Sequence, residues 1–521
     1  MNRSFDIVIA GSGFAGSLLA MIARRLGRSV LLLEKSAHPR FAIGESSTPL
    51  ANLLLEELAR RYDLPRLLPL TKWGAWQREH PEIACGLKRG FTFCHHQLDT
   101  PFALDADRHR QLMVAASPRD DIADTHWFRE EFDAFLAGEA QREGVEYLDE
   151  VTVEHVVPGT TGVTLACRRG GNGFSVAARL LVDATGPHGL LHQALRLGER
   201  ALDAYPTTQS LFTHFRGVRR LDELLAWEGE PPYPVDDAAL HHVFPGGWIW
   251  VLRFNNGITS AGVALESALA QELRLAEGAS AWRRLLNRLP TVREQFADAV
   301  ACRPFVHQPK LSFAAREVTG PNWALLPSAA GFVDPLLSTG FSLTLLGVTR
   351  LAGIIEQHWQ KPGLAAGLAD YARTTAAELD ATAGLIGALY RSMNDPELFN
   401  ALALLYFAAA SYSESARRLG RAELASGFLL HNRPGFGDGL RVCLKAGRGP
   451  LTAGAKAKLL ADILCLIEPV NVAGLANPEC RNWYPARAED LMAAAGRLLS
   501  SPAEIRAMLA ACGFSLASER K

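Results

Sequence analysis

The chain has 521 residues, which is too long for one ordinary domain and predicts two or three. Its 54 Lys+Arg and 55 Asp+Glu leave a net charge of −1, which favours neither a nucleic-acid partner nor an anionic membrane. No secretory signal and no apolar stretch of the roughly 20 residues that span a bilayer are recognisable. The eight cysteines are scattered without C-x-x-C spacing. We therefore expect reduced thiols, no metal site and a cytoplasmic location.

Residues 5–34 have the pattern of a dinucleotide-binding unit: an apolar strand, a glycine turn, a helical run and a second apolar strand. Glycines at G-x-G-x-x-G spacing permit a tight turn and let backbone N–H groups approach a pyrophosphate at a helix N-terminus. An acidic residue, 18 positions after the last of these glycines, stands where the ribose hydroxyls of a nucleotide are bound. The predicted contacts are Gly11, Gly13, Phe14, Ala15, Gly16 and Glu34.

The rest of the chain predicts three regions. Helices are expected at 51–62 and 132–142, strands at 145–148, 151–157 and 174–182, and a hairpin turn at 170–173. Strand-rich text from about 205 to 315 predicts a separate antiparallel sheet, and Ala/Leu-rich text after it predicts helices, including 401–410 and 453–467. The predicted domains are 1–200 plus 301–350, a sheet at 201–300, and a helical region at 351–521. The expected fold class is α/β, or α+β overall.

Only one dinucleotide fingerprint is present, because Gly170–Gly173 neither follows a buried strand nor opens a helix. The cofactor is therefore either NAD, or FAD that is reduced by something outside this chain.

Four further segments carry recognisable motifs, and their order along the chain is informative. They are Gly44-Glu45-Ser46 with Pro49, the stretch 85–93 around Lys88, Gly246-Gly-Trp248-Ile-Trp250, and the stretch 329–340 that ends in Ser338-Thr339-Gly340. Together they resemble the flavin-dependent halogenases, and most closely the phenolic, phloroglucinol type. The resemblance covers residues 1–350 and favours FAD over NAD as the bound cofactor.

This resemblance implies an FAD-binding, Rossmann-like domain of the glutathione-reductase and p-hydroxybenzoate-hydroxylase type. It implies FADH2 from a separate flavin reductase, O2, chloride or bromide, and a small electron-rich aromatic substrate. A helical C-terminal region would cap that substrate. Cofactor contacts carried over are Glu45, Ser46, Asp334 and Gly340, and halide contacts are Ser338, Thr339 and Gly340. Trp248 and Trp250 would separate flavin from substrate, and Lys88 would capture hypohalous acid.

Each assignment has a plainer alternative. Lys88 could be a surface charge on a strand, and Lys72 is a reserve candidate for its role. Ser338 could be an ordinary helix N-cap, and the two tryptophans could be core residues. Arg129 could reach an FAD phosphate or pair with Asp133 one helical turn away.

The sequence also departs from the family pattern. Leu337 stands where members that act on tryptophan carry a glutamate, which points away from free tryptophan. Leu252 and Arg253 replace Ile-Pro, so Arg253 would bind an anionic group or turn to solvent. Pro327-Ser328 replaces Gly-Asp.

The adjacent pairs His95-His96 and His241-His242 are expected not to bind metal, because neighbouring side chains on a strand diverge. His96 could act as a general base toward a phenol if it lines the cavity. Two other functions stay open: an FAD-dependent aromatic monooxygenase or dehydrogenase on the same scaffold, and a non-catalytic flavin-binding subunit. The sequence leaves the oligomeric state open.

Overall fold

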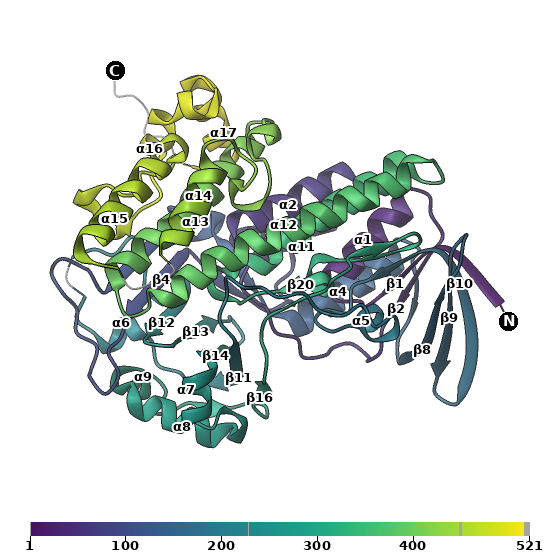
Figure 1. Cartoon of the computed structure of the whole chain (residues 1–521), viewed down its shortest axis with the longest axis horizontal. Helices are drawn as coiled ribbons and strands as arrows, with labels where there is room; N and C mark the ends of the chain where they lie inside the picture. Colours follow the sequence, from purple (N-terminus) through teal and green to yellow (C-terminus); the bar gives the residue numbers. More distant parts are fainter. Residues whose placement is uncertain (1, 228, 448–450, 515–521) are drawn as a thin grey trace.

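The structure, a computed structural model, describes residues 2–227, 229–447 and 451–514. Its N-terminal unit is built on a mostly parallel sheet, at the right of Figure 1. The central strand β1 (Asn2–Ala10) pairs in parallel with β2 (Val30–Leu33) and with β10 (Asn172–Asp183). Ile7, Val8 and Ile9 are all fully buried, as expected for a parallel strand covered on both faces.

The complete order of this sheet is β18-β19-β10-β1-β2-β7, and an antiparallel β8–β9 hairpin extends it from β10. Helices α1 and α4 pack against each other beside it, and α1 also contacts the long helix α11. The remaining elements of this unit are β7 (Glu146–Leu148), β8 (Val151–Pro158), β9 (Val163–Arg169), β18 (Thr319–Gly320), β19 (Trp323–Leu325), α1 (Phe14–Arg25), α2 (Pro49–Arg61), α4 (Arg129–Arg142), α5 (Leu190–Ala194), α10 (Pro327–Ala330) and α11 (Thr339–His358). The helices and strands predicted for residues 1–200 are confirmed to within a few residues.

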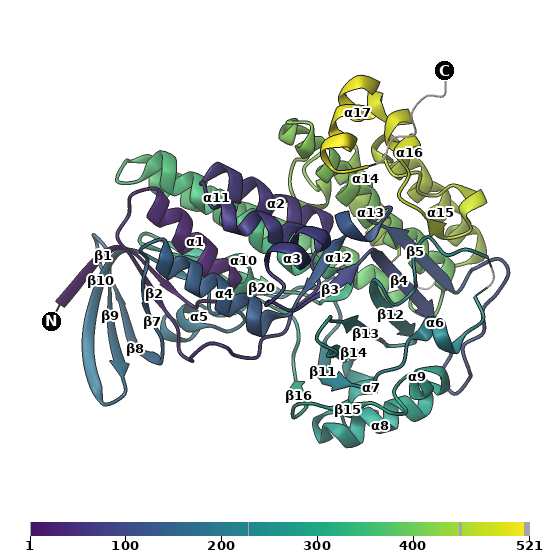
Figure 2. The same cartoon turned by 180° about the vertical axis from the view of Figure 1, so that it is seen from behind.

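The second sheet differs from the prediction in the strands that form it and in their relative directions. Its order is β15-β11-β14-β13-β12-β4-β5-β21, with β16 also paired to β11. Strands β4 and β5 come from before residue 201 and β21 from the C-terminal region, so the sheet does not keep to the predicted 201–300 boundaries. The β12–β4 and β5–β21 pairs are parallel, so the sheet is mixed and not antiparallel throughout. Figure 2 shows it from behind, beside the first unit.

The strands of this sheet are β4 (Gly90–His95), β5 (Gln111–Ala115), β11 (Thr208–Arg216), β12 (Ala239–Phe244), β13 (Gly247–Arg253), β14 (Thr259–Glu266), β15 (Val300–Ala301), β16 (Val306–Gln308) and β21 (Trp483–Tyr484). Helices α7 (Ser267–Glu272), α8 (Ala279–Arg288) and α9 (Pro290–Gln295) lie against its outer face and share a hydrophobic cluster with it. Two small ladders stand apart: β3 (Cys85–Lys88) with β6 (Asp124–Trp127), and β17 (Phe313–Ala314) with β20 (Gly331–Phe332). Short helices α3 (Trp73–Glu79) and α6 (Leu221–Leu224) complete this part.

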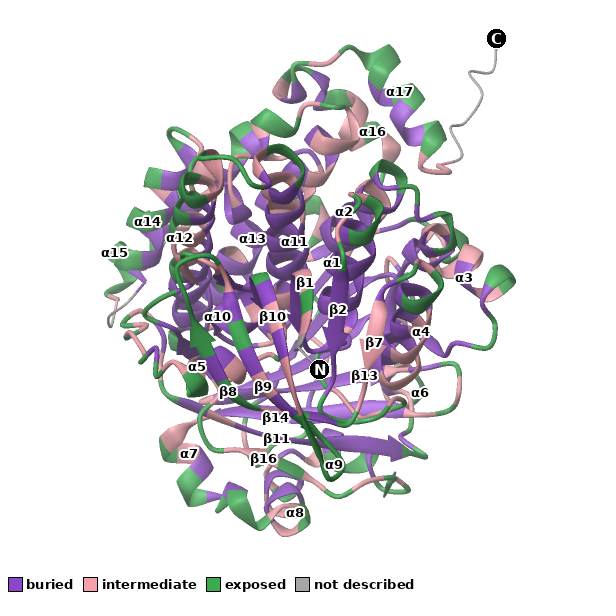
Figure 3. Ribbon diagram, turned by 90° about the vertical axis from the view of Figure 1, so that its right-hand side faces the viewer, coloured by how far each residue is buried: buried purple, intermediate pink, exposed green. Residues whose placement is uncertain are grey.

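The C-terminal region is mostly helical, as predicted. Its described helices are α12 (Gly363–Arg391), α13 (Pro396–Arg418), α14 (Phe436–Ala446), α15 (Ala453–Ile467), α16 (Ala488–Ala493) and α17 (Pro502–Ala511). Residues 448–450 and 515–521 of the predicted region lie outside the described residues. One hydrophobic cluster runs from β1 to α17, so the regions are packed together. Figure 3 shows this burial along α11 and α13, and the exposed outer surface of α15.

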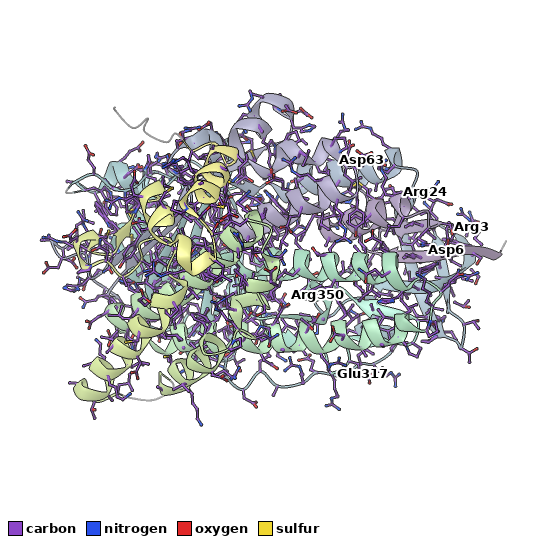
Figure 4. The ribbon with its side chains drawn as sticks, turned by 90° about the horizontal axis from the view of Figure 1, so that it is seen from above. Arg3, Asp6, Arg24, Asp63, Glu317 and Arg350 are labelled. Carbon is purple, nitrogen blue, oxygen red and sulfur yellow. The ribbon has the colours of Figure 1, made fainter. Side chains whose placement is uncertain are left out.

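Helices α11 and α12 are the long helices that connect the two ends of the molecule. They lie side by side in Figure 4, where Arg350 on α11 is labelled. The two terminal guanidinium nitrogens of Arg350, Nη1 and Nη2, donate to the carboxylate of Glu378 on α12 at 2.7 and 2.5 Å. Within the described chain, one helical stretch, Leu336–His358, is long and apolar enough to cross a membrane, but 72% of its most apolar window is buried inside the protein. This stretch is a core helix.

Candidate active site

A cavity of about 530 Å³ opens between the glycine turn, the second sheet and the start of α11. Most of the site residues predicted from the sequence line it: Gly13, Phe14, Ala15, Glu45, Ser46, Arg129, Trp248, Trp250, Asp334, Ser338, Thr339 and Gly340. Gly11, Gly16, Glu34 and Lys88 are not among the residues of this lining. The structure thus gathers segments that are more than 300 positions apart in the chain.

The glycine turn has the tight geometry that the spacing predicts. Gly11 adopts a φ of +97°, in the left-handed region that favours glycine. A Cβ on Gly16 would lie 1.9 Å from the Gly11 carbonyl oxygen, so helix α1 approaches β1 too closely for any side chain there. Gly13 is the N-cap of α1 and supplies no side-chain cap, but the backbone N–H of Phe14 in the first turn donates to Oδ1 of Asp133 at 3.2 Å, so a protein carboxylate already lies at this helix N-terminus.

Glu34 ends beside β2 with its carboxylate held by the protein itself. The backbone N–H and the hydroxyl of Ser12 donate to Oε2 at 3.0 and 2.9 Å, and Arg40 donates to the same oxygen at 3.1 Å. Burial acts to raise the pKa of Glu34, but Arg40 and the hydrogen bonds from Ser36 and Ser12 outweigh it and hold that pKa below its ordinary value. Glu34 is therefore an ionised hydrogen-bond acceptor, held in place at the end of the sheet where the nucleotide is expected.

Arg129 forms the ion pair that was one of its two alternatives. Its Nε and Nη2 donate to the two oxygens of Asp133 at 2.8 and 2.7 Å. Its remaining nitrogen, Nη1, donates to the Gly44 carbonyl oxygen at 3.0 Å. Arg129 therefore ties the loop that carries Gly44 and Glu45 to α4, and it still lines the cavity.

Glu45 is buried and paired with a histidine that the sequence did not single out. Its Oε1 lies 3.0 Å from Nε2 of His214 on β11, and the exposed fractions of the two side chains are 1% and 2%. Among the described residues, Oε2 of Glu45 has no hydrogen-bond partner. A buried acceptor without a partner, on a residue that lines the cavity, suits a ligand that brings its own donors.

The predicted halide residues sit in a strained turn at the start of α11. Leu337 and Ser338 both have left-handed backbones, with φ of 67° and 53°. Ser338 occupies the N-cap position, but its side chain makes no capping hydrogen bond, so the plain N-cap alternative is wrong. A Cβ on Gly340 would meet nothing within 4 Å. The turn therefore offers an open N-terminus of a 20-residue helix to the cavity.

Asp334, just before this turn, is fully buried and saturated by protein donors. Tyr205 and Tyr390 donate their hydroxyls to Oδ2 at 2.7 and 2.8 Å, and the Leu336 N–H donates to Oδ1 at 2.8 Å. Burial raises the pKa of Asp334 to about 6, against these hydrogen bonds. The carboxylate shapes the turn and anchors it to α12 through Tyr390.

Trp248 and Trp250 lie on β13 with ring centroids 5.6 Å apart, and both line the cavity. Trp248 donates its indole N–H to the Tyr390 hydroxyl at 3.1 Å. The rings are 1% and 6% exposed and belong to the main hydrophobic cluster. They are core residues and cavity walls at once.

Lys88 is fully buried at the end of β3. Its Nζ donates to Ser46 Oγ at 2.8 Å and to the Ser47 carbonyl oxygen, and it lies 3.8 Å from the centroid of the Phe91 ring. The alternative of a surface charge is therefore wrong. Burial lowers the pKa of Lys88 to about 7, although the nearby carboxylate of Asp124 opposes the shift.

A second, smaller cavity of about 140 Å³ lies on the far side of this lysine. Phe91, which carries the Lys88 amine on its ring face, lines the small cavity, whereas Ser46, which accepts from that amine, lines the large one. Lys72 also lines the small cavity. The other walls come largely from the C-terminal region, including Tyr406, Phe407, Ala410, Val472, Leu475, Met508 and Leu509.

Comparison with known proteins identifies this arrangement. The family model described as tryptophan halogenase matches residues 102–399, which is more than half of the chain. The chain belongs to the tryptophan halogenase family.

Relatives within this family support the assignment. The chain is 30% identical over 357 residues to monodechloroaminopyrrolnitrin halogenase PrnC of Pseudomonas fluorescens, and 31% identical over 355 residues to tetracycline 7-halogenase of Kitasatospora aureofaciens. These matches cover 67% and 66% of the chain, but only 61% and 62% of the two relatives.

The fold is that of solved halogenases. The crystal structure of halogenase PltM in complex with phloroglucinol and FAD superposes with a TM-score of 0.81 at 25% identity, covering 92% of this chain and 99% of that one. CmlS, a flavin-dependent halogenase, gives 0.60 at 21% identity, covering 90% and 78%. The mixed α/β halogenase fold expected from the sequence is confirmed.

Within the halogenase fold, two sequence expectations need correction. Arg253 neither binds a free anionic group nor turns to solvent, because its guanidinium pairs with the buried carboxylate of Asp236 at 2.9 Å. His96 is no cavity base: it lies buried against Phe102 and 2.9 Å from Nδ1 of His242, outside the lining of both cavities described above. Burial holds the pKa of His96 well below its ordinary value.

Several residues that matter here carry no sequence signal. His214, Tyr205 and Tyr390 stand outside the quoted motifs, and only the fold brings them to Glu45 and Asp334. A further group of His188, His192 and Glu199 has its ligand atoms within 4.8 Å of one another, although the sequence predicts no metal site. The Glu199 carboxylate in this group already contacts the Lys310 ammonium.

Proposed function

We propose that this protein halogenates a small electron-rich aromatic, most suitably a phenol, with reduced FAD from a separate reductase, O2 and chloride or bromide. The large cavity is the flavin and halide chamber, and the small cavity is the substrate chamber. The observation that carries the proposal is the position of Lys88, whose amine touches the lining of both cavities.

The residues of the large cavity fit FAD. The glycine turn at the N-terminus of α1 suits a pyrophosphate beside the Arg129–Asp133 pair, and Ser338, Thr339 and Gly340 present a helix N-terminus to a halide. Bound FADH2 would supply the two electrons with which O2 and halide give hypohalous acid. The predicted cofactor and halide contacts remain predictions at the level of individual residues.

The protein's own contribution begins with the lysine. A buried amine with a pKa near 7 is present both as ammonium and as free amine at neutral pH. The ammonium can donate a hydrogen bond to hypohalous acid, and the free amine can react with it to give a haloamine and water. Either route delivers the halogen to the small cavity, while Trp248 and Trp250 wall the large one.

The proposed phenolic substrate rests on two features. The small cavity has the size of a single ring and is walled by Phe91, Tyr406 and Phe407. The solved relative PltM, similar over 92% of this chain, was crystallised with phloroglucinol. A phenol also activates its own ring, so it needs no carboxylate at Leu337.

The direct test combines the protein with FAD, a flavin reductase, NADH, bromide or chloride, and a panel of phenols, with products read by mass. Mono- or dihalogenated phenol that requires the reductase is the expected result. Hydroxylated product without halogen would favour the monooxygenase alternative. No product, with tight flavin binding, would favour the non-catalytic subunit. NADH alone should reduce the bound flavin slowly at best, and rapid bleaching would contradict the two-component scheme.

A further inference from the structure

Asp124 is a buried carboxylate beside Lys88, and no motif in the sequence marks it. It is 2% exposed and lies on β6, directly across the ladder from Lys88 on β3. Asn52 on α2 donates its side-chain amide to Oδ1 of Asp124 at 2.8 Å. The Lys72 ammonium lies 4.0 Å from the same oxygen.

Asp124 is therefore a buried carboxylate at ion-pair distance from Lys72 and opposite Lys88 in the β3–β6 ladder, and the two lysines lie at different cavities. Lys72 lines the small cavity, and Lys88 stands between the small cavity and the large one. The other titratable groups that act electrostatically on this trio are His126, His241, Tyr406, Glu414 and Cys512. Burial lowers the pKa of both histidines and raises that of Tyr406, so at neutral pH these three are uncharged.

We propose that Asp124 is the positioning residue of the lysine site: it is the shared counter-charge that holds the Lys88 ammonium in the wall between the two cavities, in competition with Lys72. This inference rests on the proposed function for its catalytic meaning. The electrostatic part of the proposal, that two lysines share one carboxylate as counter-charge, does not depend on the reaction.

The physical argument is that a fully buried ammonium is costly without a negative partner. The two acceptors that Lys88 touches, Ser46 Oγ and the Ser47 carbonyl, are neutral. Asp124 is the carboxylate that favours the charged form of Lys88. Burial raises the pKa of Asp124 and the Lys72 charge opposes that shift, so Lys72 and Lys88 share one carboxylate as their counter-charge.

The proposal predicts shifts of opposite sign in two variants. Asp124→Asn keeps the shape and removes the charge, so the titration midpoint of Lys88 falls by about one pH unit or more. Lys72→Met removes the competing cation, so the same midpoint rises. Asp121→Asn is the matched control, because Asp121 lies three positions away, is half exposed and pairs with Arg119.

The measurement is carbon NMR of the protein labelled at lysine Cε, with the Lys88 resonance assigned by its loss in Lys88→Met. A fall in Asp124→Asn, a rise in Lys72→Met and no change in Asp121→Asn are the expected results. An unchanged Lys88 midpoint in Asp124→Asn would overturn the proposal. Should that variant fail to fold, Lys72→Met decides alone: a rise, or a fall because Asp124 takes up a proton once Lys72 no longer lowers its pKa, supports the shared carboxylate, and no change overturns it.

Activity gives the second readout. With a phenol and bromide, Asp124→Asn should lower kcat about tenfold, with flavin binding unchanged. The alkaline limb of the pH–rate profile should move to lower pH, because the Lys88 ammonium loses its proton at lower pH in this variant. Asp124→Glu should recover part of the rate. If the midpoints move as stated but no phenol is halogenated, Asp124 keeps its role and the proposed function fails. If halogenation proceeds at the normal rate and pH profile in Asp124→Asn, the positioning role fails and the function stands.

Discussion

Lys88 and Leu337 are the single residues on which the proposed chemistry of this site depends most. The role of Lys88 was predicted from the family resemblance of the stretch around it, and the structure adds the contacts with Ser46 and Phe91. It could not predict Asp124 as a partner, because the Lys88–Asp124 pairing depends on a ladder between β3 and β6, 36 positions apart. Leu337 is fully buried beside the proposed halide turn, so no carboxylate is available at that position.

The first prediction follows from Leu337. Free L-tryptophan should be a poor substrate, and resorcinol- or phloroglucinol-like phenols should be better, because an ionised phenol supplies its own electron density. The measurement is kcat/KM for both substrate classes under identical flavin supply. Substitution should follow the ortho and para positions of the phenol. Efficient, regioselective halogenation of tryptophan with phenols left untouched would show that Leu337 has been misinterpreted.

Helices α11 and α12 show what an individual element does for the site. Helix α11 begins at the proposed halide turn, and α12 carries Tyr390, which donates to Asp334, so the relative position of the two helices fixes the turn. The Ala/Leu-rich text predicted this region to be mostly helical, because helical composition is a local signal, but it did not give the separate bounds of α11 and α12. The contact between them was not predictable, because the Arg350–Glu378 pair joins two separate apolar helices across 28 positions.

A second prediction therefore concerns this helix pair. Arg350→Ala leaves the carboxylate of Glu378, which is 1% exposed, without its cation and should lower the free energy of unfolding by about 3 kcal/mol. Arg373→Ala on α12 is the matched control, because its partner Asp370 is exposed and the loss should be at most about 1 kcal/mol. Urea denaturation of both variants provides the comparison. Equal losses in the two variants would contradict the structural role of Arg350.

At the scale of the whole molecule, the N-terminal unit was predictable and the second sheet was not. Strand, turn and helix from 5 to 34 form a local pattern, whereas β4 joins β12 across about 150 positions and β21 joins β5 across some 370. Pairings of this kind depend on the packing of the entire chain. The same sheet collects buried histidines from β4 and β12, and this has a consequence for stability.

The third prediction is acid instability that originates in this sheet. Burial lowers the pKa of His95 and His242 to about 4 and that of His241 to about 3. In the unfolded chain these groups titrate near 6.5, so below that pH the unfolded state binds more protons and stability falls as pH falls. Each histidine adds a slope of up to about 1.4 kcal/mol per pH unit between roughly pH 6 and 4. Asp334, whose pKa is raised to about 6, opposes part of this loss.

Denaturant unfolding at pH 7.5 and 5.0 measures the effect. His242→Asn should reduce the slope of the unfolding free energy against pH by the contribution of about one histidine. His155→Asn, on the exposed part of β8, should leave that slope unchanged. Equal stability of the unmodified protein at the two pH values would contradict the prediction.

The most direct test of the account is a halogen balance for Lys88→Met, measured with FAD, a reductase, NADH, bromide and phloroglucinol. We predict that this variant oxidises flavin and still forms hypobromous acid, which a trap such as monochlorodimedone captures in solution, while bromination at the protein site falls at least a hundredfold. The wild type should give brominated phloroglucinol and little trapped oxidant. Normal bromination by Lys88→Met, insensitive to the trap, would contradict the central role of this lysine between the two cavities.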